Sequence, residues 1–219
     1  MDSQRITTLE SSDELLENIE SHFKLCAGPG SGKTRFLINH IKNVIKNSNR
    51  LTNARKIACI TYTNIGVDTI KRRLGNAINK VEVSTIHSFL YRHVVKPYLW
   101  IINDEYNIPL EKFEGHSEIM PTFSIMQEWL KRTNQQYVMD YNKLKKELLD
   151  LQWVVQDGDI NLKFKYPSKL MIRNDSLIEY KKVCWEKALI AHDDILYLSY
   201  KILTKNSRIL EIWRAKFPY

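Results

Sequence analysis

The chain has 219 residues, of which 43% are hydrophobic and 26% charged. This is the balance of a globular protein with one substantial domain, or one domain carrying an inserted subdomain. No apolar run approaches the ~20 residues that cross a bilayer, and the acidic N-terminus does not read as a secretory signal, so no membrane partner is expected. The three cysteines and six histidines show no ligand spacing, which predicts reduced cysteines, no zinc and a cytoplasmic location.

The net charge of +8 is unevenly distributed along the chain. Residues 1–20 hold one Arg and six acidic residues, whereas residues 21–100 hold fourteen Lys and Arg against only Asp68 and Glu82. Part of this basic charge belongs to an ordinary solvated surface. So large a local excess nevertheless indicates a polyanionic partner.

The first elements expected along the chain surround a glycine-rich loop. Residues 7–21 fit an acidic helix with Ser11 or Ser12 as its cap, and Phe23–Cys26 fits a short buried strand. From Phe36 onward, apolar residues recur at helical spacing.

The loop between this strand and this helix has the composition of a phosphate-binding loop. Gly28, Gly30 and Gly32 permit backbone conformations that turn successive N–H groups toward an anion, and the start of the next helix points at the same place. Lys33 would reach the β- and γ-phosphates of a nucleotide, and the Thr34 hydroxyl would ligate Mg²⁺. A chance glycine-rich turn is the alternative, but strand, loop and helix stand in the order that a P-loop requires.

Two further strand–helix units follow this loop. Residues 56–63 fit a buried strand, and Asn64 is expected to cap a helix that ends at Gly75. Residues 80–85 fit a third strand, followed by a helix over residues 86–95 that should stop near Pro97. Strand–helix units in series predict a parallel sheet covered by helices.

The pattern changes after about residue 98 to long helical segments, such as residues 123–132 and 141–155. Helices are expected again at residues 192–203, with Asp193 or Asp194 as the cap, and at residues 207–219. The predicted organisation has three parts, in chain order: residues 1–98, residues 99–190 as a mainly helical insert, and residues 191–219 as a return to the first domain.

Five stretches in sequence order resemble one family, the UvrD/Rep/PcrA-like superfamily 1 DNA helicases. The matching stretches are AGPGSGKTR at 27–35, ITYTN at 60–64, VSTIHSF at 83–89, HDDIL at 192–196 and WRAKFPY at 213–219. The resemblance implies a P-loop NTPase (RecA-like) α/β fold with helices on both faces of a parallel sheet, interrupted by a mainly α-helical inserted subdomain. It also implies ATP and Mg²⁺ as cofactors and single-stranded or partly duplex DNA as partner.

The resemblance and the local chemistry together assign the candidate site residues. The nucleotide-binding set is Ala27, Gly28, Pro29, Gly30, Ser31, Gly32, Lys33, Thr34 and Arg35, with Lys33 and Thr34 also catalytic. The DNA-binding set is Thr61, Tyr62, Thr63, Asn64, Thr85, His87, Ser88 and Phe89. Tyr62 would stack on a base, and the turns after two strands would hold phosphates. Core packing for Tyr62 or Phe89, and a structural hydrogen bond for His87, remain alternatives.

Several departures from the family pattern accompany this resemblance. The glutamine that reads adenine is replaced by Ser11, Ser12 and Asp13, so adenine selectivity is open. The sequence stops at Tyr219, before the Asp-Glu of the Walker B strand, which the resemblance suggests would pair beside Phe23–Cys26. Asp193-Asp194 is the alternative Walker B pair, although HDDIL better matches the element that precedes Walker B.

The sequence therefore supports one main function and two alternatives. The main hypothesis is the N-terminal portion of an ATP-dependent DNA helicase that grips single-stranded DNA and continues past Tyr219. The first alternative is a catalytically incomplete module that regulates a partner, such as a nuclease in an anti-phage defence complex. A small-molecule kinase is the second alternative, and it leaves the DNA-like turns unexplained.

Overall fold

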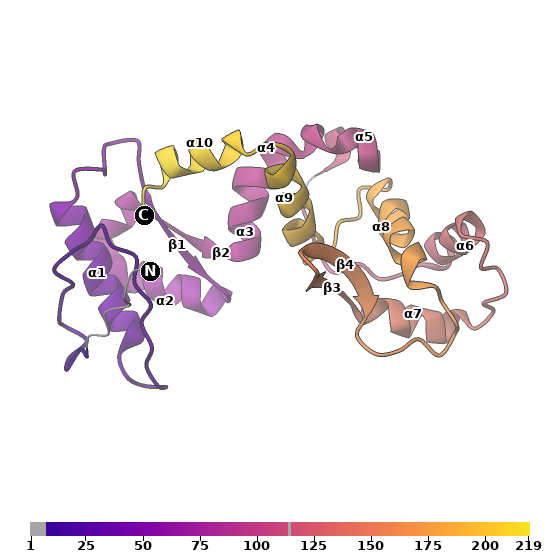
Figure 1. Cartoon of the computed structure of the whole chain (residues 1–219), viewed down its shortest axis with the longest axis horizontal. Helices are drawn as coiled ribbons and strands as arrows, with labels where there is room; N and C mark the ends of the chain where they lie inside the picture. Colours follow the sequence, from indigo (N-terminus) through magenta and orange to yellow (C-terminus); the bar gives the residue numbers. More distant parts are fainter. Residues whose placement is uncertain (1–7, 114) are drawn as a thin grey trace. The chain divides into compact units, whose positions relative to one another are not determined.

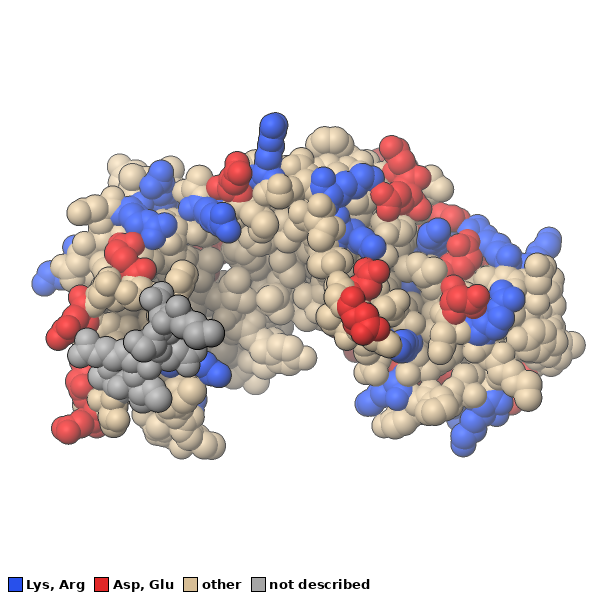
Figure 2. All heavy atoms as spheres, in the orientation of Figure 1, with Lys and Arg blue, Asp and Glu red and all other residues tan. Residues whose placement is uncertain are grey.

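The computed structural model describes residues 8–113 and 115–219, which form two compact units (Figure 1). The first unit contains the described residues up to Ile86 together with Leu210–Tyr219, and the second contains His87–Ile209. Helices and a small parallel sheet give the chain a mixed α/β fold. None of the helices in the described part is long and apolar enough to cross a membrane. Acidic and basic side chains are both exposed on the surface (Figure 2).

The first unit is built around two parallel strands. Its elements are α1 (Lys33–Asn47), β1 (Ile57–Thr61), α2 (Asn64–Leu74), the 3₁₀ helix η1 (Gly75–Lys80), β2 (Val81–Thr85) and most of α10 (Arg208–Lys216). Ile57 pairs with Val81 and Cys59 with Val83, so these four side chains share one sheet face. Buried apolar residues of α1 and α2 pack against that face and form the core.

The loop-preceding strand predicted at Phe23–Cys26 is absent, because this segment joins no ladder in the described structure. The main chain at the C-terminal end lies beside β1 instead. Lys56 N–H donates to the Lys216 carbonyl (3.1 Å) and Ala58 N–H to the Tyr219 carbonyl (2.8 Å). The placement of the next strand beside Phe23–Cys26 is thus not what the structure has, since the segment leading to it follows β1. A short apolar run becomes a strand only when a neighbour pairs with it.

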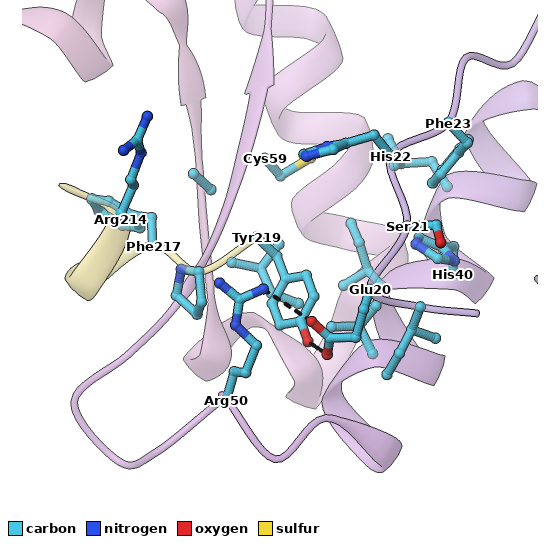
Figure 3. A pocket seen from close by; sticks show the side chains of 17 residues that line it. Glu20, Ser21, His22, Phe23, His40, Arg50, Cys59, Arg214, Phe217 and Tyr219 are labelled. Atoms are coloured by element: carbon cyan, nitrogen blue, oxygen red, sulfur yellow. Dashed lines mark hydrogen bonds and ion pairs between the residues drawn. The ribbon is translucent and has the colours of Figure 1, made fainter. Parts of the chain in front are cut away.

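A cavity of about 590 Å³ lies beside β1 and is lined by α1, residues 19–23 and the C-terminal segment (Figure 3). At its rim the Tyr219 hydroxyl is hydrogen-bonded to Glu20 and lies 2.8 Å from the Ser48 hydroxyl. Arg50 donates to the same Glu20 carboxylate (2.9 Å). No residue of the glycine-rich loop lines this cavity. Phosphate sites formed by main-chain N–H groups at a helix start are shallow, so the loop geometry locates the candidate site better than the cavity does.

The N-terminal segment predicted as a helix over residues 7–21 contains only turns from residue 8 onward, while residue 7 lies outside the described residues. Ser11 N–H donates to the Glu14 carboxylate (2.5 Å), and Asp13 N–H to the Ser11 hydroxyl (3.2 Å). These local bonds are those of a helix cap, but the turn they close is not continued into a helix.

The second unit is mainly helical and contains one β-hairpin. Its helical elements are α3 (Ile86–Leu90, begun in the first unit), the π-helical turn η2 (Tyr91–Val95), α4 (Lys96–Tyr98), η3 (Leu99–Ile101), α5 (Asn103–Tyr106), η4 (Leu110–Lys112), α6 (Phe123–Arg132), α7 (Tyr141–Leu149), η5 (Asn174–Ser176), α8 (Leu177–Trp185) and α9 (Asp194–Lys205). Its two strands are β3 (Leu151–Gln156) and β4 (Asp159–Phe164), which pair antiparallel.

Two predictions of helix boundaries in this unit were wrong. The helix expected over residues 141–155 ends at Leu149, and β3 begins at Leu151. The helix expected to stop near Pro97 continues through it, because Pro97 lies at the start of α4, directly after the π-helical turn. Proline is tolerated in the first turn of a helix, where its missing N–H has no partner to lose.

Candidate nucleotide and nucleic-acid sites

The glycine-rich loop has the backbone geometry that an anion site needs. Gly30 and Gly32 have φ values of 77° and 85°, in the left-handed region that favours glycine. Gly32 is the N-cap of α1, no described side chain caps this helix, and its first turn contains no acidic residue. The first N–H groups of α1 therefore remain available to an anion, and the helix dipole favours negative charge there.

Lys33 is folded back onto its own loop. Its ammonium group donates to the carbonyl of Ala27 (2.8 Å) and to that of Gly28, and the Ser31 hydroxyl also donates to the Gly28 carbonyl (2.8 Å). An exposed lysine held by carbonyls can exchange them for phosphate oxygens without moving out of a buried site. The loop therefore fits a triphosphate: Lys33 would bind the phosphates, and the exposed Thr34 hydroxyl would hold the Mg²⁺ that offsets their charge.

The segment before the loop contacts it through Ser12 and Asp13. Both carboxylate oxygens of Asp13 accept from Arg35, at 2.8 and 2.6 Å, and Asn39 donates to the same carboxylate at 2.9 Å. A Cβ on Gly32 would lie 2.8 Å from the Cβ of Ser12, so this close approach requires glycine. These contacts were not predicted, although Ser11–Asp13 was noted as the place where the family's glutamine is missing.

The turn after β1 presents the most exposed of the predicted DNA-binding residues. The Tyr62 side chain is 84% exposed, which argues against the core alternative. Thr63, not Asn64, is the N-cap of α2: its hydroxyl accepts from Gly66 N–H (3.1 Å), while the Thr61 hydroxyl donates to the Thr63 carbonyl (2.9 Å). Thr61 and Thr85 are register partners, so the two predicted turns start at the same edge of the sheet.

The second predicted turn is much less exposed. Thr85, His87 and Phe89 are buried, and Ser88 is half-buried. The Phe89 ring lies 4.8 Å from the His93 ring, between centroids, which gives it a packing contact in the second unit. Tyr62 is thus the better candidate for stacking on a base, and the roles of the second turn stay predictions.

His87 belongs to a cluster of three histidines in the second unit. The Nδ1 atoms of His116 and His192 are 2.8 Å apart, and the His87 and His192 ring centroids are 4.2 Å apart. Burial, with the charge on His192 as a further cause, lowers the pKa of His87 and of His116. Asp193 Oδ1, 3.5 Å from His87 Nε2, opposes this shift for His87.

The carboxylate of Asp194, considered above as half of an alternative Walker B pair, lies in the interior of the second unit. It is fully buried and accepts from the indole N–H groups of Trp153 (3.1 Å) and Trp185 (2.9 Å) and from Ala191 N–H (3.0 Å). Lys181 forms an ion pair with it at 2.8 Å. A carboxylate so fully engaged by protein donors supports a structural role.

Comparison with known proteins identifies the family. Residues 9–219 match the UvrD/REP helicase N-terminal domain, so the chain belongs to that family. ATP-dependent DNA helicase Rep of Buchnera aphidicola subsp. Baizongia pistaciae is 26% identical over 219 residues, covering 96% of this chain and 30% of that protein. The Gabija protein GajB of Bacillus cereus is 27% identical over 245 residues, covering 88% of this chain and 34% of that protein.

A third relative gives the same picture. DNA helicase II of Rickettsia typhi is 23% identical over 213 residues, covering 91% of this chain and 30% of that protein. The chain therefore spans about a third of the length of these relatives. The resemblance found in the five sequence stretches is confirmed at the level of the family.

Proposed function

We propose that the chain is the ATP-binding N-terminal portion of an ATP-dependent DNA helicase or translocase. The observation that carries this proposal is the uncapped start of α1, where left-handed glycines and the exposed Lys33 meet. In the same unit, the turn after β1 presents Tyr62 to solvent. A nucleotide grip and a base-stacking residue on one parallel sheet are what a motor needs to couple hydrolysis to movement along a strand.

The finer features of the fold and cofactors belong to this proposal. They are a RecA-like sheet with helices on both faces, the three-part organisation at residues 1–98, 99–190 and 191–219, ATP with Mg²⁺, and a cytoplasmic location. The family membership and the names of the Rep and DNA helicase II relatives support them. Lys33 and Thr34 would bind and orient the triphosphate, while the carboxylates that complete hydrolysis would come from polypeptide following Tyr219.

A DNA-binding measurement with paired variants tests the proposal. Tyr62→Ala should weaken binding of a dT₂₀ oligonucleotide by ~1–3 kcal/mol, whereas Tyr62→Phe, which keeps the ring, should bind like the parent. Lys33→Ala should lose nucleotide binding and keep DNA binding. Equal DNA affinity for Tyr62→Ala and the parent would remove the turn after β1 from the DNA site.

A regulatory module without turnover is the second candidate. Two relatives favour it by name: the Gabija protein GajB and the ATP-dependent helicase/nuclease of Bacillus cytotoxicus, one chain of which is 25% identical over 146 residues that cover 58% of this chain. In this case the partner would be a nuclease, as in an anti-phage defence complex. ATP binding without DNA-stimulated hydrolysis, in a native product of 219 residues, would favour the module over the motor.

A further inference from the structure

Lysines surround exposed aromatic side chains on one surface of the second unit. Lys143 and Lys146 come from α7, and Lys165, Tyr166 and Lys169 come from the segment that follows β4. We refer to these five residues as the lysine–tyrosine patch. All of them except Lys165 line a hollow of about 340 Å³, to which Phe164 and Pro167 contribute apolar atoms.

The two halves of the patch are held together by hydrogen bonds to α7 and the residue after it. One carboxylate oxygen of Glu147 accepts from the Ser168 hydroxyl (2.5 Å), and the other accepts from Lys169 N–H (3.1 Å). Lys165 N–H donates to the Asp150 carbonyl (2.9 Å). Because these bonds fix the segment against the helix, the lysines stand on both sides of a preformed hollow.

The positive charge of the patch is not neutralised locally. Within residues 8–113 and 115–219, none of its four ammonium groups is in an ion pair, whereas Lys181, Lys187 and Lys205 all are. The carboxylates of the hollow are Glu147, already engaged by two donors, and Asp150. Four such cations around two carboxylates attract an anion with several charges.

The aromatic component distinguishes this surface from an ordinary solvated helix face. The Tyr166 side chain is 64% exposed, and the Lys165 ammonium lies 5.5 Å from its ring centroid. An exposed ring flanked by lysines offers a stacking surface for a base and cations for the phosphates on either side. An acidic peptide would use the lysines but would leave the ring without a partner.

We propose that the lysine–tyrosine patch is a nucleic-acid contact that binds single-stranded DNA by stacking on Tyr166 and by lysine–phosphate contacts. This goes beyond the proposed function, because it uses different residues from the turns after β1 and β2. Two contacts on one strand raise the overall affinity, since binding at the first makes the second intramolecular.

The salt dependence of dT₂₀ binding tests the lysines in the full chain. Each phosphate contact on a single strand contributes about 0.7 to the slope of log K against log salt, so Lys146→Ala/Lys169→Ala should reduce the slope by about 1.4. Lys131, an exposed lysine of α6 that does not line the hollow, provides the matched control. Lys131→Ala should keep the slope of the parent, and an unchanged slope in the double variant would overturn the proposal.

The stacking component is tested by replacing the ring. Tyr166→Ala should lower dT₂₀ affinity about tenfold, and Tyr166→Phe should restore it. Trp100, an equally exposed aromatic outside the patch, provides the control Trp100→Ala, which should bind like the parent. Competition by a ten-residue polyglutamate peptide as effective as that by dT₂₀ would identify a general polyanion surface and overturn the DNA assignment.

The same measurements separate this proposal from the proposed function. If the β1 turn is not a DNA site, Tyr62→Ala will be neutral while Tyr166→Ala still weakens binding. If the patch is wrong, the reverse holds. A parent chain that binds no dT₂₀ at low salt overturns the patch, while binding of a fluorescent ATP analogue still reports on the loop.

Discussion

Arg35, on the first turn of α1, is held by both carboxylate oxygens of Asp13, which lies twenty-two residues earlier in the chain. The pair is more than half exposed on both sides, so it contributes little to stability. Its effect on ligands is larger in principle, because Asp13 places a negative charge beside a loop that is expected to bind phosphates. Asp13 also occupies the region where the family's adenine-reading glutamine is missing.

Removing this carboxylate should therefore favour an anionic ligand. We expect Asp13→Asn to bind a triphosphate about two- to fivefold more tightly, since an exposed charge pair is worth about 0.2–1 kcal/mol. Glu14→Gln removes a nearby charge that does not contact Arg35 and serves as the control. Titration with a fluorescent ATP analogue measures both, and weaker binding by Asp13→Asn would show that the pair organises the site.

Gly32 and Gly28 provide a matched pair for testing the loop geometry. A Cβ at Gly32 would approach the Cβ of Ser12 to 2.8 Å, at a left-handed φ, whereas a Cβ at Gly28 would meet nothing within 4 Å. Gly32→Ala should thus lower the free energy of unfolding by about 1–2 kcal/mol and weaken nucleotide binding. Gly28→Ala should do much less. Urea unfolding and nucleotide titration measure these effects, and equal behaviour of the two variants would contradict the loop geometry.

The histidine cluster predicts that stability depends on pH. Folding lowers the pKa of His87 and His116 below the value of about 6.5 for unfolded chains, so the folded state binds fewer protons. This stability is fully present above pH ~6.5 and is lost as the pH falls through the folded pKa values.

Thermal unfolding between about pH 7.5 and pH 5.5 measures this loss. His116→Phe keeps an aromatic ring at the position beside Tyr91 and His192 but cannot titrate, so its Tm should fall less over this range. The account of the cluster fails if the parent and His116→Phe lose the same number of degrees.

The buried pair of Asp194 and Lys181 makes a further prediction about stability. Asp194→Asn leaves the Lys181 charge buried without its partner, which should cost about 3–5 kcal/mol of unfolding free energy. Asp193→Asn, at an exposed position, should cost under about 1 kcal/mol. Denaturant unfolding of both variants gives these values. Loss of nucleotide binding without loss of stability in Asp194→Asn would instead revive the alternative Walker B assignment.

The sequence predicted best the elements that local chemistry specifies. Buried β-branched runs gave β1 and β2 close to their observed bounds, and Gly75 ended α2 as expected. The exposed Tyr62 after β1 also followed from its place at a strand end. In each case, the pattern of apolar residues and the turn residue agreed with the tertiary contacts.

The β-hairpin of the second unit was missed although the sequence carries its signal. Asp157 and Gly158 both have positive φ and join Gln156 to Asp159 as a two-residue hairpin turn. Asp-Gly between β-branched and aromatic runs is a strong hairpin signal. It was overridden by the helical spacing of the preceding residues, which belongs to α7 and ends at Leu149.

Other features depend on partners distant in the sequence, and local patterns do not contain them. Phe23–Cys26 is apolar enough for a strand, but its conformation depends on which segment lies beside it. The contact of Asp13 with Arg35 and the burial of Phe89 are likewise tertiary facts. Sequence reasoning assigned Phe89 to the DNA site because its motif does so in the family.

The most direct test of the central claim is binding of a fluorescent ATP analogue, with Mg²⁺, by the full chain and two variants. The account predicts saturable binding by the parent, loss of binding in Lys33→Ala with unchanged thermal stability, and a reduced effect of Mg²⁺ in Thr34→Ala. Lys42→Ala, on the same helix but outside the loop, should bind like the parent. Equal nucleotide affinity for the parent and Lys33→Ala, or no binding by the parent, would contradict the assignment of this loop as the nucleotide site.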